Sequence, residues 1–222
     1  MTKIDMKANV YNRNQEMADA LRSRFTNAKT YVINIVSSPG SGKTSLIEQM
    51  APRLMPELNL FVIDGDVETQ CDAIRLQNAG IPAVQIETHG SCHLDVPMIE
   101  KALTGIELAN IDLLIIENIG NLICPVGFDL GEHLRVVMAS LTEGEDKPMK
   151  YPQAYRKAQV CVFNKIDLAE FIPFDMEKFQ MAAKRANENI DFFDVSCTKG
   201  NGIDQWCSYI KDKVRQHKSI QP

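Results

Sequence analysis

The chain has 222 residues, 45% of them hydrophobic and 24% charged, which is ordinary for one compact domain spanning 1–222. Its formal net charge of -5 argues against nucleic acid or anionic membrane as a partner, because both need clustered Lys and Arg. It contains no run of 18 apolar residues and no apolar signal-peptide core. We therefore expect a cytoplasmic protein that binds small ligands and other proteins.

The first predicted element is a helix over residues 5–28, within an N-terminal helical segment at 1–30. Apolar side chains recur there mostly at helical spacing, at Met6, Val10, Met17, Leu21 and Phe25. Polar residues lie between them, so the helix is predicted to be amphipathic. We expect its apolar face to pack on the domain's own sheet rather than on a partner.

Across residues 31–222, short β-rich runs alternate with longer helical stretches. Several runs are apolar almost throughout, as strands of a parallel sheet covered on both faces should be. The predicted strands are YVINIVS (31–37), LFVID (60–64), AVQIET (83–88), DLLIIEN (112–118), LRVVMASL (134–141), QVCVFN (159–164) and DFFDVS (191–196). This alternation predicts a doubly wound α/β domain with a mostly parallel sheet and helices on both faces. Residues 142–152, TEGEDKPMKYP, are predicted to be a loop because they contain two prolines.

The stretch SSPGSGKT lies between the first predicted strand and a predicted helix. It follows the phosphate-loop pattern G-x-x-x-x-G-K-[ST], except that Ser37 replaces the first glycine, a position that only opens the turn. Gly40 and Gly42 give the backbone freedom to wrap phosphate, Lys43 can reach the β and γ oxygens, and the Thr44 hydroxyl can bind Mg²⁺. The predicted nucleotide-binding residues of this loop are Pro39, Gly40, Ser41, Gly42, Lys43, Thr44 and Ser45.

The motif NKID follows the sixth predicted strand at its carboxyl end, where α/β sheets bind ligands. The Asp167 carboxylate can accept hydrogen bonds from both N1–H and the N2 amino group of guanine, whereas adenine offers no such pair of donors. Asn164 would contact the base edge and brace the phosphate loop, and the Lys165 stem would lie over the ring. The motif therefore favours GTP and GDP over ATP and opposes a P-loop kinase or ATPase. Ser196 and Cys197, after the last strand, are predicted to complete the base pocket.

Three acidic residues lie at or just beyond strand ends near the predicted phosphates. Asp66, Asp72 and Glu117 can hold Mg²⁺ directly or through water, together with Thr44. The sequence does not rank the three acids, and for Asp72 a solvated loop carboxylate is an equal alternative. We predict Lys43, Asp66 and Glu117 as the catalytic residues.

Cysteine and histidine residues form a further candidate site. Cys92, His93 and Cys124 offer thiolate and imidazole ligands, which suit Zn²⁺ or Ni²⁺ better than Mg²⁺. Their spacing matches no standard zinc motif, so the residues alone favour a structural role. Three ligands would also leave a tetrahedral site to be completed by water, another residue or a second subunit. No C-x-x-C pair occurs, so a disulfide framework is not expected, and the remaining cysteines are predicted to be core thiols: Cys71, Cys161, Cys197 and Cys207.

Taken together, these motifs resemble the HypB family, the GTPases that help insert nickel into [NiFe]-hydrogenase. The motifs SSPGSGKT, GDVETQCDA, CHLD, IENIGNLICPVGFDLG, TEGEDKPMKYP and NKIDLAE occur in the family's order, and CHLD with ENIGNLICP is the specific part. The resemblance implies a Mg²⁺-dependent GTPase that forms a homodimer and acts with other hydrogenase-maturation proteins. It also implies a Ni²⁺ or Zn²⁺ site made by Cys92, His93 and Cys124 at the dimer interface. The Cys-rich or His-rich N-terminal extension of some members is absent, so nickel storage is not expected.

The spacing of two predicted site residues suggests a mechanism. Cys124 lies seven residues after Glu117, in a Gly-containing segment that should move with the γ-phosphate, as GTPase switch segments do. Nucleotide state would then change metal binding and dimerisation, and hydrolysis should be slow because no catalytic Gln or arginine finger is evident. Two alternatives remain: a urease-type nickel-insertion GTPase, opposed by Cys-Pro-Val in place of Cys-Pro-His, and a metal-binding scaffold with incidental GTPase activity. The choice of metal, and ligation by His89 or His133, stay open.

Overall fold

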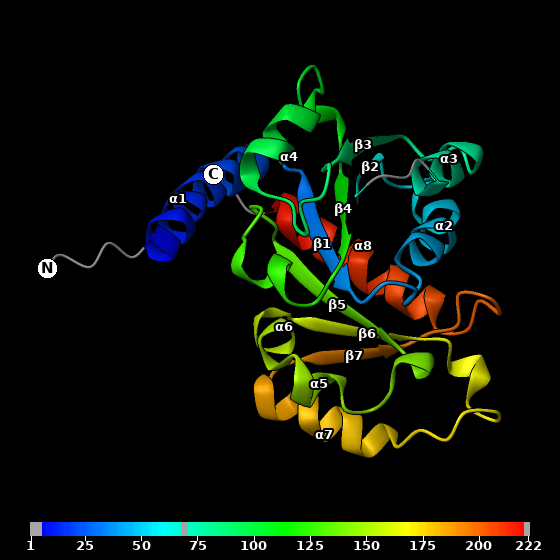
Figure 1. Cartoon of the computed structure of the whole chain (residues 1–222). Helices are drawn as coiled ribbons and strands as arrows, with labels where there is room; N and C mark the ends of the chain where they lie inside the picture. Colours follow the sequence, from blue (N-terminus) through cyan, green and yellow to red (C-terminus); the bar gives the residue numbers. More distant parts are fainter. Residues whose placement is uncertain (1–5, 68–70, 220–222) are drawn as a thin grey trace, which may run out of the picture.

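The computed structural model describes residues 6–67 and 71–219, with side chains from residue 13 onward. Its centre is one seven-stranded parallel sheet with the order β3-β2-β4-β1-β5-β6-β7 (Figure 1). The strands are β1 Tyr31–Ser37, β2 Leu60–Asp66, β3 Ala83–Glu87, β4 Leu113–Gly120, β5 Leu134–Ser140, β6 Val160–Asn164 and β7 Asp191–Asp194. All seven predicted strands are present, and the parallel sheet is confirmed.

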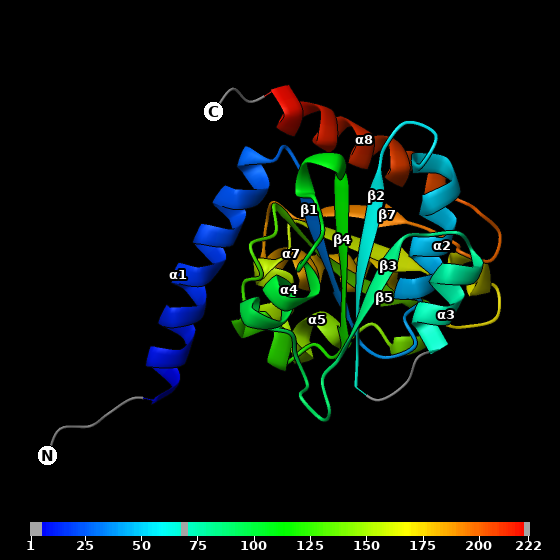
Figure 2. The ribbon, with the colours of Figure 1, turned by 90° about the horizontal axis from the view of Figure 1, so that it is seen from above.

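Helices cover both faces of the sheet, which confirms the doubly wound architecture (Figure 2). The helices are α1 Met6–Asn27, α2 Lys43–Leu54, α3 Cys71–Asn78, α4 Val96–Ala102, α5 Lys147–Lys150, α6 Pro152–Lys157, α7 Met176–Ala186 and α8 Ile203–Ser219. Helices α2, α3 and α8 share one hydrophobic cluster with the sheet, whereas α1, α4, α6 and α7 pack on the opposite face. None of the helices within the described ranges is long and apolar enough to cross a membrane.

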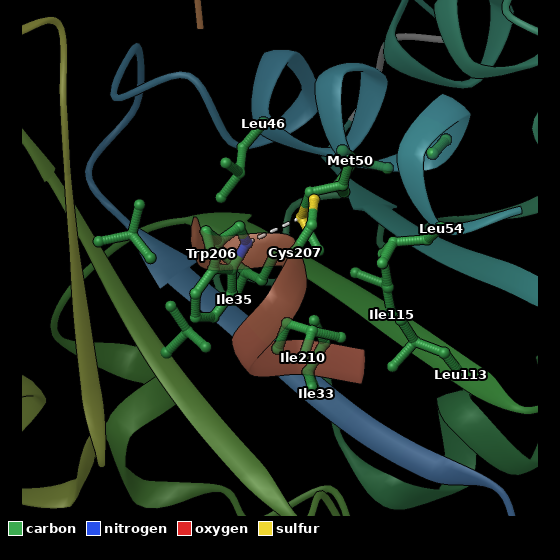
Figure 3. Close-up of a cluster of buried hydrophobic side chains, with 14 of the residues drawn as sticks. Ile33, Ile35, Leu46, Met50, Leu54, Leu113, Ile115, Trp206, Cys207 and Ile210 are labelled. Atoms are coloured by element: carbon green, nitrogen blue, oxygen red, sulfur yellow. Dashed lines mark hydrogen bonds between the residues drawn. The ribbon is translucent and has the colours of Figure 1, made fainter. Parts of the chain in front are cut away.

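The central strand β1 is buried on both faces because its side chains alternate between two cores. Ile33 and Ile35 pack under α2 and α8, beside Trp206 and Met50 (Figure 3). Val32, the residue before Ile33, faces the cluster that contains α1 and α4. An almost unbroken apolar strand is therefore required here, and the sequence signal for β1 was correspondingly strong.

The N-terminal helix packs on its own domain. Ala18, Leu21 and Phe25 of α1 are fully or almost fully buried in the cluster that also contains Val32 of β1. Two residues used to predict this helix, Met6 and Val10, have side chains outside the described ones.

The prediction of a loop at 142–152 was wrong in part. The one-turn helix α5 begins at Lys147, and α6 begins at Pro152, with an interruption at Tyr151. Pro148 and Pro152 both lie in the first turn of a helix, where a missing amide hydrogen costs no hydrogen bond. The prolines therefore divide the segment into two short helices rather than preventing helix formation.

Candidate functional site

The phosphate loop connects the carboxyl end of β1 to the first turn of α2. Gly40 and Gly42 both have positive φ angles, 77° and 101°, and a Cβ atom on Gly42 would lie 2.5 Å from the Asn164 amide nitrogen. Glycine is therefore required at position 42 by both conformation and space. Ser37 is still part of β1, so its position needs no glycine conformation, and its hydroxyl accepts a hydrogen bond from Lys43 at 3.3 Å.

A cavity of about 690 Å³ brings the phosphate loop, the acidic residues and the NKID motif together. The predicted residues that line it are Gly40, Gly42, Lys43, Thr44, Ser45, Asp72, Glu117, Asn164, Lys165, Asp167 and Cys197. The remaining predicted residues, Pro39, Ser41, Asp66 and Ser196, do not line it. Helix α2 begins at Lys43, so the positive end of its dipole lies at this cavity, a favourable place for phosphate.

Glu117 is the most deeply buried predicted acid in the cavity. Its Oε1 accepts a hydrogen bond from the Thr44 hydroxyl at 2.7 Å, and its buried Oε2 has no hydrogen-bond partner. Burial raises the pKa of Glu117 to about 8, although Lys43 acts in the opposite direction. A carboxylate oxygen without a donor, beside a hydroxyl, fits a divalent cation such as Mg²⁺.

A second buried carboxylate, Asp64, was missed by the sequence analysis. It lies next to Glu117 in the register of β2 and β4, is 1% exposed, and its Oδ2 has no hydrogen-bond partner. Burial, with the nearby charges of Asp72 and Asp66, raises its pKa to about 7. The sequence signal was present, because Asp64 ends the run LFVID, but it was counted only as a strand residue.

The two other predicted acids are placed differently. Asp66 does not line the cavity, and its Oδ1 accepts a hydrogen bond from the amide of Val67 at 2.6 Å. Asp72 does line it and forms an ion pair with Arg75 at 3.1 Å. Arg75 also pairs with Glu48 at 2.6 Å, so its charge is already compensated. Residues 68–70 of the motif GDVETQCDA lie outside the described ones.

The NKID motif is tied to both neighbouring loops by hydrogen bonds. The Asn164 side chain donates to the carbonyl of Ser41 at 2.9 Å and accepts from the amide of Cys197 at 3.1 Å. Lys165 donates to the carbonyl of Gly40 at 2.7 Å, and Asp167 accepts from the Ser196 hydroxyl at 2.5 Å. Asn164 thus fixes the phosphate loop relative to the end of β7, and Ser196 orients the Asp167 carboxylate without lining the cavity itself.

Cys92, His93 and Cys124 lie together at the carboxyl edge of the sheet, although they are far apart in sequence. The structure pairs Cys92 and Cys124 as a disulfide with a Cα–Cα distance of 6.1 Å, which the sequence analysis did not expect. His93 Nδ1 lies 3.9 Å from Cys92 Sγ, and its ring stacks on Phe128 with centroids 3.8 Å apart. Asn121 donates to the carbonyl of Cys92 at 3.2 Å and so links the two segments. The same two sulfurs, as thiolates, are suitable ligands for one soft metal ion.

The other candidate histidines and cysteines have different surroundings. Both His133 nitrogens are used elsewhere, since Nδ1 accepts from the amide of Val32 at 3.0 Å and Nε2 lies 3.1 Å from the Thr26 hydroxyl. His89 is exposed on a turn with φ of 49°. Cys71 is exposed at the start of α3, so its assignment to the core was wrong, whereas the three other predicted core cysteines are buried. Among the described residues, no three His, Cys, Asp or Glu side chains form a ready metal site within one chain.

Comparison with known proteins identifies the family. Residues 31–194 match the family model described as "CobW/HypB/UreG, nucleotide-binding domain". The chain belongs to this family. Its similarity to the HypB branch extends over nearly the whole chain: it is 42% identical over 208 residues to the hydrogenase maturation factor HypB of Escherichia coli K12, which covers 94% of this chain and 72% of that protein.

Solved HypB structures of the family have the same fold. The crystal structure of HypB from Archaeoglobus fulgidus aligns with a TM-score of 0.84 and 39% identity, covering 91% of this chain and 99% of that one. HypB from Helicobacter pylori, solved in complex with nickel, aligns with a TM-score of 0.87 and 32% identity, covering 95% and 99%. The resemblance to HypB that the motifs indicated is confirmed.

Proposed function

We propose that this protein is a Mg²⁺-dependent GTPase that delivers nickel to [NiFe]-hydrogenase during maturation, in the cytoplasm and together with other maturation proteins. The observation that carries the proposal is the single cavity in which the phosphate loop meets the NKID motif. The names of its HypB relatives, and the nickel in one of their structures, support the assignment to hydrogenase maturation.

In the proposed hydrolysis, residues in and beside the cavity have separate tasks. The Asp167 carboxylate accepts hydrogen bonds from guanine, while the loop amides and Lys43 bind the phosphates. Thr44 and Glu117, with Asp64 beside them, would hold Mg²⁺, which when bound neutralises charge on the β and γ oxygens. Arg75 is already paired with Glu48 and Asp72, so the described part of the cavity offers no uncompensated arginine and turnover should be slow.

For the metal cargo, we propose Cys92, His93 and Cys124 as ligands in the reduced protein. Ni²⁺ and Zn²⁺ both accept thiolate and imidazole ligands, and three ligands leave a position for a further one. Ile123, next to Cys124, is 68% exposed, and we propose that a dimer partner covers this edge. A homodimer formed there would supply the missing ligand from the partner and shield both metal sites.

The test combines nucleotide and metal titrations of the reduced protein. We expect GTP and GDP to compete with each other and ATP to compete poorly, and Lys43→Ala to abolish turnover while leaving the fold intact. Ni²⁺ binding should differ between the GDP and GTP-analogue states, with oligomer mass followed in parallel. Equal competition by ATP would refute the guanine assignment. Normal hydrogenase maturation by Lys43→Ala would instead favour the scaffold alternative, in which hydrolysis is incidental.

A further inference from the structure

The segment 142–148, within the motif TEGEDKPMKYP, contacts the phosphate loop, and none of its residues lines the nucleotide cavity. Glu143 Oε1 accepts a hydrogen bond from the Ser41 hydroxyl at 2.5 Å and another from the Ser140 hydroxyl at 3.0 Å. The Ser41 side chain is therefore turned toward Glu143, and neither residue lines the cavity. The sequence analysis treated Ser41 as a phosphate-binding residue and the segment as a loop without a task.

A lysine of the same segment reaches the start of the loop. Lys147 Nζ donates to the Ser38 hydroxyl at 3.0 Å and lies 3.7 Å from Glu143 Oε2. The Glu143 side chain is 9% exposed, the Lys147 side chain is 19% exposed, and Glu143 Oε2 has no hydrogen-bond partner. A mostly buried pair of opposite charges thus holds the phosphate loop at two residues, Ser38 and Ser41.

These contacts use only side-chain hydroxyls of the loop. Phosphate is bound by backbone N–H groups of such a loop, and none of the contacts from Glu143 or Lys147 uses one of them. Hydrogen bonds to ionised groups are about twice as strong as neutral ones, so this pair can fix the loop before nucleotide arrives. Fixing the loop in advance lowers the ordering cost that nucleotide binding would otherwise carry.

We propose that Glu143 and Lys147 are positioning residues of the phosphate loop, acting through Ser41 and Ser38 rather than by touching the nucleotide. The proposal rests on the proposed nucleotide site. Glu143→Ala should weaken the binding of GDP and of a non-hydrolysable GTP analogue by the same factor, about 10- to 100-fold, the range for losing a hydrogen bond to a charged group. Turnover at saturating GTP should change much less, because the support that Glu143 gives the loop stabilises the bound ground state and the transition state equally.

A double-mutant cycle with Ser41→Ala tests the route of this effect. If Glu143 acts through Ser41, the double variant binds GDP with no lower affinity than the single variant that binds it less tightly. Glu143→Gln, which keeps an acceptor oxygen, should recover part of the affinity. Lys147→Met should show the same equal loss for both nucleotides, and it tests the proposal should Glu143→Ala fail to fold. Glu145→Ala is the matched control, because this neighbour pairs with Lys178 at 2.5 Å and does not contact the loop; its affinity should equal that of the parent.

Three results would overturn the proposal. Parent-like affinity in folded Glu143→Ala and Lys147→Met would show that the loop needs no such support, and additive losses in the cycle would show that Glu143 does not act through Ser41. A loss confined to the GTP analogue would place the two side chains on the γ-phosphate instead. A parent protein that binds ATP in place of GTP would refute the proposed guanine preference but leave this inference standing, whereas a parent that binds neither would refute both.

Discussion

Replacing Gly120 by alanine should weaken the proposed coupling between nucleotide and metal binding. Gly120 ends β4, and a Cβ atom on it would lie 3.1 Å from Pro39 Cα and 3.2 Å from Pro39 N and Cγ. The phosphate loop and the strand that leads to Cys124 therefore touch at this point. An added methyl group must push the two segments apart by a few tenths of an ångström, and overpacking of this kind costs about 1–3 kcal/mol.

The expected loss of coupling in Gly120→Ala follows from comparing the overpacking cost with the coupling free energy. Coupling between two sites typically amounts to about 1–3 kcal/mol, or roughly 5- to 150-fold in affinity, so a disturbance of equal size at the contact can remove most of it. Because linkage is reciprocal, GTP and Ni²⁺ should change each other's affinity by the same factor in the parent protein. In Gly120→Ala this factor should be closer to 1, the value for two independent sites.

The assay is a Ni²⁺ competition titration of the reduced protein with GDP and with a non-hydrolysable GTP analogue. Cys124→Ala should weaken Ni²⁺ binding and remove the nucleotide dependence while leaving GTP binding nearly unchanged. Cys71→Ala, which removes an exposed thiol away from the metal segment, is the matched control and should behave like the parent. An unchanged ratio of affinities in Gly120→Ala would refute this contact as the route, and equal affinities in the parent would refute the coupling altogether.

Three further predictions concern single side chains. Asp167→Asn should weaken GTP binding and favour xanthosine nucleotides, since the amide can donate to the xanthine C2 oxygen; an unchanged GTP preference would contradict the base assignment. Asp64→Asn should raise the free energy of unfolding of the nucleotide-free protein at pH 8 by on the order of 1–3 kcal/mol, because a buried carboxyl whose pKa is raised to about 7 is ionised there, with no hydrogen-bond partner for its Oδ2; at the same time the substitution should weaken Mg²⁺-dependent turnover. Burial lowers the pKa of His133 to about 4, below its unfolded value near 6.5, so stability should fall as the pH decreases from 6.5 toward 4, by at most about 2 kcal/mol at pH 5. Chemical denaturation at several pH values should show a smaller loss in His133→Asn, which keeps an acceptor for the Val32 amide, and identical profiles would contradict the assignment.

The fold was largely predictable because its signals are local. A strand buried on both faces must be largely apolar, and β1 shows this pattern with Asn34 as its one internal polar residue. The phosphate loop and the NKID motif were equally readable, because their chemistry depends on neighbouring residues. The short helix at Lys147–Lys150 was missed because proline was taken to end helices, although it is compatible with their first turn.

The parts that escaped the sequence depend on distances across the fold. Ser41 and Glu143 are 102 positions apart, and only the adjacency of β1 and β5 brings their ends together. No spacing rule brings the Cys92 and Cys124 sulfurs together either; only the family resemblance predicted that they share a site, and their disulfide was not expected. Asp64 was overlooked because β2 runs two residues beyond the predicted strand end, which places this carboxyl inside the sheet beside Glu117.

The buried indole beneath helix α2 provides a natural optical probe. Trp206 is the chain's single tryptophan, it is 0% exposed, and its N–H donates to the Met50 sulfur at 3.0 Å (Figure 3). Met50 lies on the helix that begins with the phosphate-loop lysine, so a movement of that helix changes the surroundings of the fluorophore. Intrinsic emission should therefore report any movement of α2 that accompanies nucleotide binding, in unlabelled protein and without a signal from any second indole.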